Sequence, residues 1–344
     1  MHLRPDHAVR DLPTLHAFIQ QHPLGIITTS LPSEIHPTLQ CSHIPWVLDS
    51  EATISNTQTN KESNNAEPPP LGVLRGHIAR QNPQSKAMVD AVLENTANRN
   101  SGTSIPGAFP TLEPELESES EATGHTLPGE VLIVFTSPVD HYITPNFYTE
   151  SKPATGKVAP TWNYAAVQVY GRATIYHDAK DANTEQFLRT QLGDLARLGE
   201  EGVMGFQDQD KDHSQEQAVA ASATGTGTGA GPTSETKTTT NTAKKDQANQ
   251  GLSTNPETSI TEGNAASPTP WKIADAPLEY IATLLKNIIG MRIEITRIEG
   301  RFKVSQERPV NDRGGVVEGL EGMGSVRARD MALFVKRGKV VDSP

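Results

Sequence analysis

Apolar and polar residues alternate with two different periods along the chain, and the longer period predicts three helices. Residues 12–22 place their apolar side chains on one face, and Asp11 precedes them as a candidate N-cap. The same spacing recurs over 185–198 and over 278–285, where Asp275 is the candidate cap. These segments are long enough for amphipathic helices that each cover part of a core.

The shorter period predicts strands. The predicted strands cover residues 25–29, 39–48, 71–78, 131–135, 162–176 and 291–296. The segment 162–176 is the strongest, with Gly171 as a bend or bulge, and Pro45 places 39–48 at a sheet edge. Helices do not separate the strands regularly, so we expect an α+β domain around an antiparallel sheet or barrel rather than a doubly wound dinucleotide fold.

Three stretches are too polar to contribute to a core: 49–70, 97–128 and 207–270. Within the last of these, the large apolar residues are Val219, Leu252 and Ile260 alone. Such segments bury too little apolar surface to offset chain entropy, so we interpret them as disordered, low-complexity insertions into one domain. The ordered parts of that domain are then about 1–48, 71–96, 129–206 and 271–337.

Composition narrows the class of protein. Of 344 residues, 35% are hydrophobic, and the formal net charge is -11, which disfavours direct nucleic-acid binding over the whole surface. The single cysteine, Cys41, excludes an internal disulfide framework. We find no signal peptide and no membrane span, and we expect an intracellular protein, cytoplasmic or nuclear.

Standard catalytic signatures are missing from the sequence, so no catalytic residue is assigned and no metal site is predicted. Candidate binding chemistry lies near His77, Arg80 and Asn82, which follow a strand and could hold a phosphate. Thr28 and Thr29 end another strand and could donate hydroxyls. For each group the plain alternative is structural: a solvated strand end, or threonine as a good strand residue.

A second candidate lies at the start of the strongest strand. Trp162, Asn163 and Tyr164 combine stacking surface with an amide, which suits a flat heteroaromatic ring. The alternative is a core tryptophan next to a capping asparagine. The segment from Ile298 to Gln306 carries charges that could face a ligand, although a solvated face is the simpler interpretation.

Several motifs, taken in order, resemble the PaiB-like family of FMN-binding negative transcriptional regulators. The matching pieces are Gly25–Thr29, Ser42–Pro45, Gly76–Gln84, Val131–Tyr148, Pro160–Val167, Ile298–Gln306 and Gly315–Leu320, the last beginning a C-terminal helix. Each piece is weak alone, but their order covers nearly the whole chain outside the insertions. The sequence departs from the family pattern at Ser85, where an aromatic residue is usual, and in the 207–270 insertion.

The resemblance implies a split β-barrel with flanking helices and FMN at the interface of a homodimer. Arg80 would then contact the FMN phosphate, helped by His77, by Asn82 and by Thr28 or Thr29. Trp162 and Asn163 would lie beside the isoalloxazine ring.

Three functions follow as hypotheses. The first is a homodimeric flavin-binding regulator. The second is an enzyme, either a flavin-dependent oxidoreductase or a haem-handling split barrel. The third is a cofactor-free module that binds protein partners through its insertions.

Overall fold

The computed structural model describes residues 1–50, 71–101, 125–207 and 269–341. The chain forms two units, Met1–Gly199 with Lys272–Pro344, and Glu200–Trp271. The account below concerns the first unit. The first and third predicted insertions, 49–70 and 207–270, lie almost entirely outside the described residues.

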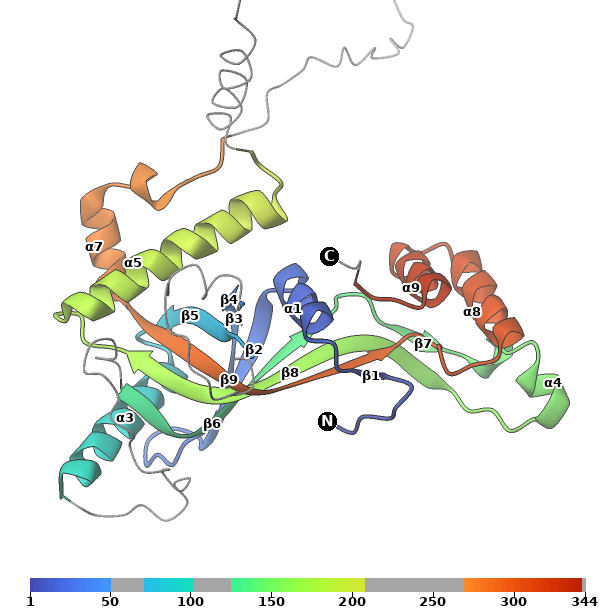
Figure 1. The fold of residues 1–344 in the computed structure, drawn as a ribbon, viewed down its shortest axis with the longest axis horizontal. Coiled ribbons are helices and arrows are strands. Elements are labelled where there is room, and N and C mark those ends of the chain that lie inside the picture. Colours follow the sequence, from blue (N-terminus) through green and yellow to red (C-terminus); the bar gives the residue numbers. More distant parts are fainter. Residues whose placement is uncertain (51–70, 102–124, 208–268, 342–344) are drawn as a thin grey trace, which may run out of the picture. The chain divides into compact units, whose positions relative to one another are not determined.

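The elements follow the predicted order closely (Figure 1). The strands are β1 Ala8–Val9, β2 Leu24–Ser30, β3 Leu39–Pro45, β4 Val47–Asp49, β5 Val73–Ala79, β6 His125–Thr136, β7 His141–Ile143, β8 Thr161–Tyr176 and β9 Ile288–Lys303. The α-helices are α1 Leu12–Gln21, α3 Pro83–Ser101, α4 Ser151–Thr155, α5 Ala182–Arg197, α7 Leu278–Lys286, α8 Val310–Gly322 and α9 Val326–Arg337. Shorter helical turns are η1 Pro145–Phe147, η2 Leu198–Val203 and η3 Ile273–Asp275.

The predicted α+β class with an antiparallel sheet is confirmed. Hydrogen-bonded neighbours follow the order β3-β2-β6-β8-β9-β5-β4, with β1 on β9 and β7 on β8. Every pairing is antiparallel, and the hydrogen-bonded sheet is open between β3 and β4. These two edge strands are consecutive in the chain, however, and only Trp46 separates them. One bent segment therefore reaches both ends of the sheet, and Pro45 lies at an edge as predicted.

Alternation along the strands separates two faces of the sheet. In β2 and β8 the side chains that point inward are buried, whereas those between them stay half-buried or exposed. The inward side chains meet α1 and α3 in the main core, which includes Leu15, Phe18, Ile133 and Phe135. Gly171 lies at a register shift between β8 and β9, so the predicted bulge is confirmed.

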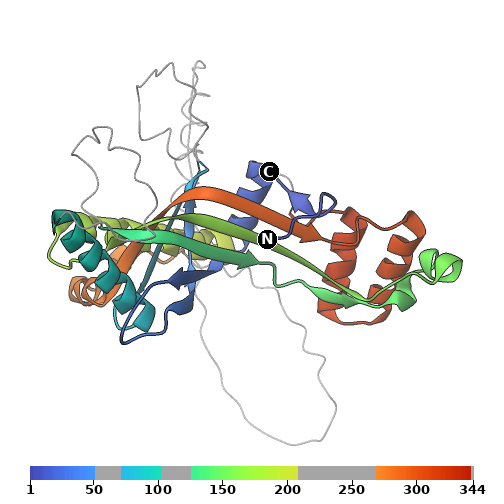
Figure 2. The same cartoon turned by 90° about the horizontal axis from the view of Figure 1, so that it is seen from below.

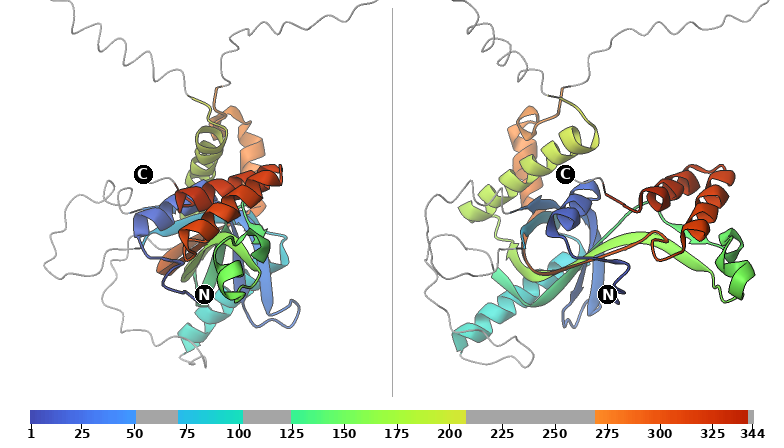
Figure 3. Two further views of the ribbon diagram at one scale, coloured as in Figure 1. Left: turned by 90° about the vertical axis from the view of Figure 1, so that its right-hand side faces the viewer. Right: turned by 45° about the vertical axis from the view of Figure 1, so that its right-hand side comes forward.

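The paired strands β8 and β9 extend beyond this core and carry a second group of elements. We call that group the arm: β7, η1, α4, α8 and α9, with the ends of β8 and β9 to which they attach. We call the rest of the unit the body. Figures 2 and 3 show α4, α8 and α9 together at one end of the β8–β9 pair, with α3, α5 and α7 at the other.

The arm has its own apolar core. Its buried members are Ile143, Tyr148, Val316, Leu320, Ala328, Met331, Ala332 and Val335. Gly315 and Gly319 allow Phe147 to pack directly on α8, because a Cβ at either position would collide with Phe147. This close approach explains why a glycine-rich segment forms a helix here in spite of its low helix propensity.

Three sequence expectations need correction. α3 continues to Ser101 and β6 begins at His125, so the insertion predicted at 97–128 overlaps an element at each end. Helix α3 was not predicted, because its mostly polar sequence buries only a short apolar side. Asp275 does not cap α7, whose N-cap is Pro277. The Asp275 carboxylate instead accepts from the Lys272 N–H at 2.8 Å.

Candidate functional site

Arg80 lies just after β5 and ties three backbone segments together. Its Nε donates to the Lys286 carbonyl at 3.0 Å, and its Nη2 donates to the carbonyls of His177 at 2.7 Å and Ile288 at 3.1 Å. These carbonyls belong to the end of α7, the start of β9 and the loop after β8. The guanidinium therefore joins segments far apart in sequence, and its predicted contact with a phosphate stays a prediction.

Asn82 and Gln84 complete this arrangement, which we call the clamp: Arg80, Asn82 and Gln84. The Asn82 carboxamide accepts from the Gln84 N–H at 2.8 Å and donates to the Ser42 hydroxyl at 3.1 Å. The Gln84 side chain is only 1% exposed, and its amide donates to the Thr29 hydroxyl at 3.1 Å. The clamp thus fixes the start of α3 on β2 and β3.

Ser85 is buried in the same turn. It is 1% exposed, and its hydroxyl donates to the Ala79 carbonyl at 2.8 Å. A larger aromatic residue has no space there without rearrangement. The departure from the family pattern at this position is therefore accommodated by the local packing.

His77 contacts helix α5. Its Nδ1 lies 2.7 Å from the Gln191 side-chain oxygen, and Gln191 is fully buried. Burial lowers the pKa of His77, and the Gln191 hydrogen bond opposes that effect. The imidazole is therefore neutral at pH 7, which weakens any attraction for a phosphate.

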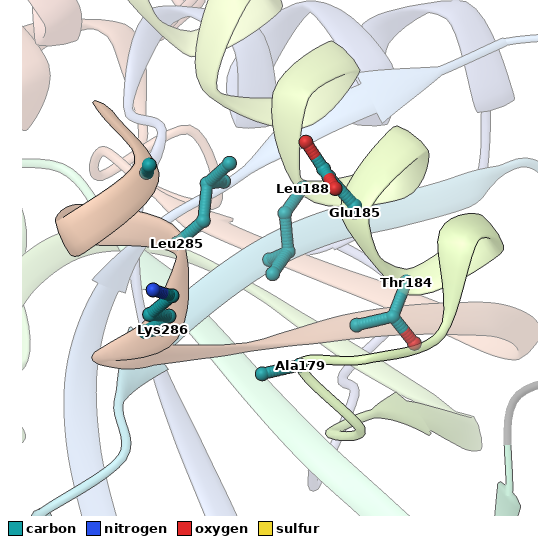
Figure 4. Close-up of a pocket in the computed structure, with 7 residues that line it drawn as sticks. Ala179, Thr184, Glu185, Leu188, Leu285 and Lys286 are labelled. Carbon is teal, nitrogen blue, oxygen red and sulfur yellow. The ribbon is translucent and has the colours of Figure 1, made fainter. Parts of the chain in front are cut away.

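A small cavity lies between α5 and α7 (Figure 4). Thr184, Leu188, Leu285 and Lys286 contribute to its wall, and its volume is about 80 Å³. Ligand pockets commonly measure roughly 300–1,000 Å³, so this cavity does not accommodate a flavin.

Thr28 belongs to a different surface from Thr29. The Thr29 side chain points inward, whereas Thr28 is half-buried on the outward side of β2. We call this surface the outer face. Its half-buried apolar and aromatic members, set in register across β2, β6 and β8, are Ile26, Leu132, Val134, Tyr164 and Tyr170.

Two arginines of β9 cover tyrosines of the outer face. The Arg297 guanidinium lies 3.6 Å from the centre of the Tyr170 ring, and that of Arg301 lies 5.6 Å from the Tyr164 ring. Arg301 has a buried Nε with no hydrogen-bond partner among the described residues. Aromatic faces next to guanidinium groups can bind both a planar ring and an anion.

Trp162 extends this aromatic series into the arm. Its side chain is 51% exposed, and its indole N–H donates to the Asp140 carboxylate at 2.8 Å. The Tyr142 ring meets it edge to face, with ring centres 6.1 Å apart. The indole is therefore accessible, and its predicted contact with a ligand stays a prediction.

Asn163 points the other way, into a buried polar cluster that we call the joint: Asn163, Lys303, Ser305, Glu307 and His7. The Asn163 amide donates to the Ser305 hydroxyl at 2.9 Å. Ser305 has a φ of 62°, a left-handed conformation uncommon outside glycine and stabilised here by that bond. His7 Nε2 lies 3.1 Å from the Glu307 carboxylate.

Lys303 is the buried cation of the joint. The residue is 7% exposed, and its amine donates to the Thr161 hydroxyl at 2.5 Å and the Trp162 carbonyl at 3.0 Å. Burial lowers the pKa of Lys303 to about 8, and the nearby Glu307 opposes that effect. A perturbed lysine and a strained backbone in one place mark the joint as a position under functional or structural constraint.

The seven predicted residues therefore occupy four environments. Arg80 and Asn82 belong to the clamp, where Thr29 contacts Gln84. His77 lies against α5, Asn163 is in the joint, and Thr28 and Trp162 are on the outer side of the sheet. Register places Thr28 level with Tyr170 of β8, roughly 25 Å along the strand from Trp162. One chain does not gather all seven around a single ligand.

Sequence reasoning missed the cation–aromatic pairs and the joint. Tyr164, Tyr170, Arg297 and Arg301 occupy alternate positions on two strands, and that signal was readable from the sequence once the strands were paired. The role of Lys303 was not readable, because an isolated lysine near a strand end is usually solvated.

The outer face fits the chemistry of FMN better than the clamp does. It offers aromatic rings beside two guanidinium groups, of which Arg301 donates to the His2 carbonyl at 3.0 Å and Arg297 to the Glu299 carboxylate at 2.7 Å. The Arg80 guanidinium, by contrast, donates to three carbonyls. Tyr164, Tyr170, Arg297 and Arg301 would hold the flavin, and bound FMN would supply hydride or electron transfer. Among the described residues, no group of three or more His, Cys, Asp or Glu could hold a metal ion.

An α+β sheet protein with an aromatic and cationic outer face is the class that the fold and site define. The chain matches the family described as "Putative FMN-binding domain" over residues 1–223 and 236–297, and it belongs to that family. FMN is accordingly its candidate cofactor. In the described part of the chain, no helix has both the length and the apolar character needed to cross a membrane.

Similar proteins occur in Aspergillus, Emericella and Saccharomyces. An uncharacterized protein of Aspergillus fumigatus is 38% identical over 99% of both chains, and one of Emericella nidulans is 34% identical over the same shares. A protein of Saccharomyces cerevisiae is 50% identical over 50 residues, which is 14% of this chain and 28% of the yeast protein.

Two solved structures show a distant likeness to this chain. A putative 5-nitroimidazole antibiotic resistance protein from Bacteroides thetaiotaomicron aligns with a TM-score of 0.30 and 6% identity, over 85% of this chain and 84% of its own. A flavocytochrome from Azotobacter vinelandii aligns with a TM-score of 0.33 and 9% identity, over 88% and 72%.

Proposed function

We propose that this protein is a homodimeric FMN-binding protein that holds its flavin against the outer face, between two copies of the chain. The observation that carries the proposal is the pairing of Tyr164 with Arg301 and of Tyr170 with Arg297 on a half-exposed sheet face. The family to which the chain belongs supports FMN as the ligand.

The separation of the predicted residues supports the dimer. Thr28 and Trp162 lie on the outer side of the same sheet, roughly 25 Å apart by strand rise. A twofold axis parallel to the sheet and perpendicular to the strands would bring the Trp162 end of one copy beside the Thr28 end of the other, because an isologous interface pairs each surface with its counterpart. Ile26, Leu132 and Val134 would supply the apolar centre of that interface.

The finer part of the proposal is a regulatory role of the PaiB-like type, in which the bound flavin acts as a signal and is not turned over. It rests on the motif resemblance, and the net charge of -11 favours a protein partner over direct contact with DNA. Steady consumption of NADH or NADPH by the flavin-loaded protein would instead establish the oxidoreductase alternative.

The first experiment is an absorbance spectrum of the purified full-length protein, followed by titration with FMN. Bound flavin shows bands near about 370 and 450 nm, and light scattering of the loaded protein should give the mass of two chains. A protein that neither copurifies with FMN nor binds added FMN overturns the proposal. A loaded monomer overturns the placement between two copies.

Two tyrosine variants test the outer face. Tyr170→Ala should weaken FMN binding about threefold to tenfold, because it removes one stacking partner. Tyr280→Ala is the matched control, since Tyr280 is 61% exposed on α7, away from the outer face. Equal affinities of the two variants contradict the assignment of the flavin to the outer face.

A further inference from the structure

Trp162 has an unusual combination of exposure and order. Its side chain is 51% exposed, so packing alone does not select its rotamer. Its orientation is instead set by polar and edge contacts, namely the Asp140 carboxylate on its indole N–H and the Tyr142 ring at its edge. An exposed indole fixed in this way is ready to contact a ligand without first losing side-chain entropy.

Asp140 is itself held by helix α9. The Arg327 Nε donates to the Asp140 carbonyl at 2.9 Å, and its Nη2 pairs with the second carboxylate oxygen of Asp140. Arg327 lies in the first turn of α9, and this helix packs into the arm core through Ala328 and Met331. The position of the indole is therefore linked, through one carboxylate, to the packing of the arm.

A surface ion pair of this kind contributes little to stability. The Arg327 side chain is 57% exposed and that of Asp140 is 26% exposed, and such pairs typically contribute about 0–1 kcal/mol. Here the two carboxylate oxygens serve different donors, one for Trp162 and one for Arg327. Loss of Arg327 would leave the carboxylate free to rotate towards water and release the indole.

We propose that Asp140 and Arg327 are positioning residues that preset Trp162 for the flavin ring. The inference rests on the proposed function, and it goes further by assigning a binding role to helix α9, which contains neither a predicted site residue nor a residue of the outer face. It also links the arm to ligand binding, because a change in the packing of α9 would reach the ligand through Arg327, Asp140 and Trp162.

The test uses full-length protein labelled with 5-fluorotryptophan, in which the three tryptophans give separate fluorine resonances and Trp162→Phe identifies one of them. Arg327→Ala should shift or broaden the Trp162 resonance and leave those of Trp46 and Trp271 unchanged. It should also weaken FMN binding by about two- to tenfold. Arg329→Ala is the matched control, because Arg329 lies on the same helix and makes no hydrogen bond or ion pair with Asp140, and it should change neither readout.

The outcomes separate this inference from the proposed function. An unchanged Trp162 resonance in Arg327→Ala overturns the positioning role whether or not FMN binds. A changed resonance with unchanged FMN affinity overturns the link to the flavin. If the wild type binds no FMN, the proposed function fails, and the resonance alone decides whether Arg327 sets the indole. Asp140→Leu should reproduce the effect of Arg327→Ala, with the melting temperature measured to confirm folding.

Discussion

The body and the arm use polar side chains in opposite ways. In the body, Arg80, Asn82 and Gln84 are directed at backbone and side-chain acceptors of the same domain. In the arm, Trp162 is exposed beside a buried lysine and a strained serine. The polar motif of the clamp thus stabilises the fold, whereas side chains suited to a ligand lie where aromatic residues are accessible to solvent.

The two regions also differ in how their cores are built. The body core draws on strands and helices from both ends of the sequence. The arm core comes from residues 139–158 and from α8 and α9. Phe334 packs against both. The question is whether the two cores unfold together or separately.

The largest expected effect on stability comes from truncating one buried side chain in each core. Phe135→Ala, in the body, removes a ring that is 0% exposed and should cost about 3–5 kcal/mol of unfolding free energy. Leu320→Ala, in the arm, should cost about 2–5 kcal/mol. Hydrogen exchange should show Phe135→Ala accelerating exchange throughout the unit, and Leu320→Ala accelerating it in α8 and α9 first.

Uniform acceleration in both variants would show a single cooperative unit and remove the distinction between body and arm. Leu333→Ala is a suitable control for the arm, since that leucine is 44% exposed and its loss should change exchange little.

The next effect concerns pH at the joint between the two regions. The pKa of Lys303 is about 8 in the folded protein, against 10.5 for an unburied lysine. Between these values the unfolded chain binds more protons, so stability should rise with pH from about 8 to 10.5, by up to about 3 kcal/mol. Below pH 8 both states are protonated and the burial penalty is fully present.

Urea unfolding at several pH values checks this expectation. Lys303→Met should abolish the rise, because an apolar side chain has no proton to lose. Lys303→Arg should abolish it too, because the guanidinium remains charged throughout that range. A rise that persists in the methionine variant would assign it to another group.

The smallest expected effect on stability comes from removing one helix N-cap in each region. Asp11 accepts from the Thr14 N–H at the start of α1, and Ser325 accepts from the Ala328 N–H at the start of α9. Asp11→Ala and Ser325→Ala should each cost about 1 kcal/mol. Exchange should quicken locally at α1 in the first variant and at α9 in the second; a body-wide response to Ser325→Ala would contradict a separate arm.

Most of the fold could be predicted from periodicity. Helix α1 with its Asp11 cap, the long strand β8 and the bulge at Gly171 all carry local signals. Helix α9 was missed although its sequence carries local signals of the same kind. Ser325 is its N-cap, Gly338 is its C-cap, and its buried residues have helical spacing. For β9, the exposed positions Thr296 and Arg297 in the middle of the strand interrupt the alternation, so the predicted strand ended at Thr296 whereas β9 continues to Lys303.

The candidate site was less predictable. Trp162 stood out as an aromatic residue at the mouth of a strand, and the structure leaves it accessible. The assignment of Arg80 to a phosphate remains a prediction, because sequence alone cannot tell a guanidinium that binds carbonyls from one that awaits an anion. Arg297 and Arg301 can be recognised as site residues only when β8 is paired with β9, because that pairing brings them next to Tyr170 and Tyr164.

The pairing of β8 with β9 has a consequence for how the chain reaches its native state. The two strands are joined through a connection from Tyr176 to Ile288 that contains the whole 207–270 insertion. Loop-closure entropy grows only logarithmically, by about 0.6 kcal/mol for each doubling of length, so lengthening that insertion during evolution would hardly change stability. The cost falls on kinetics, because a register set by contacts so distant in sequence is found late and slowly in folding.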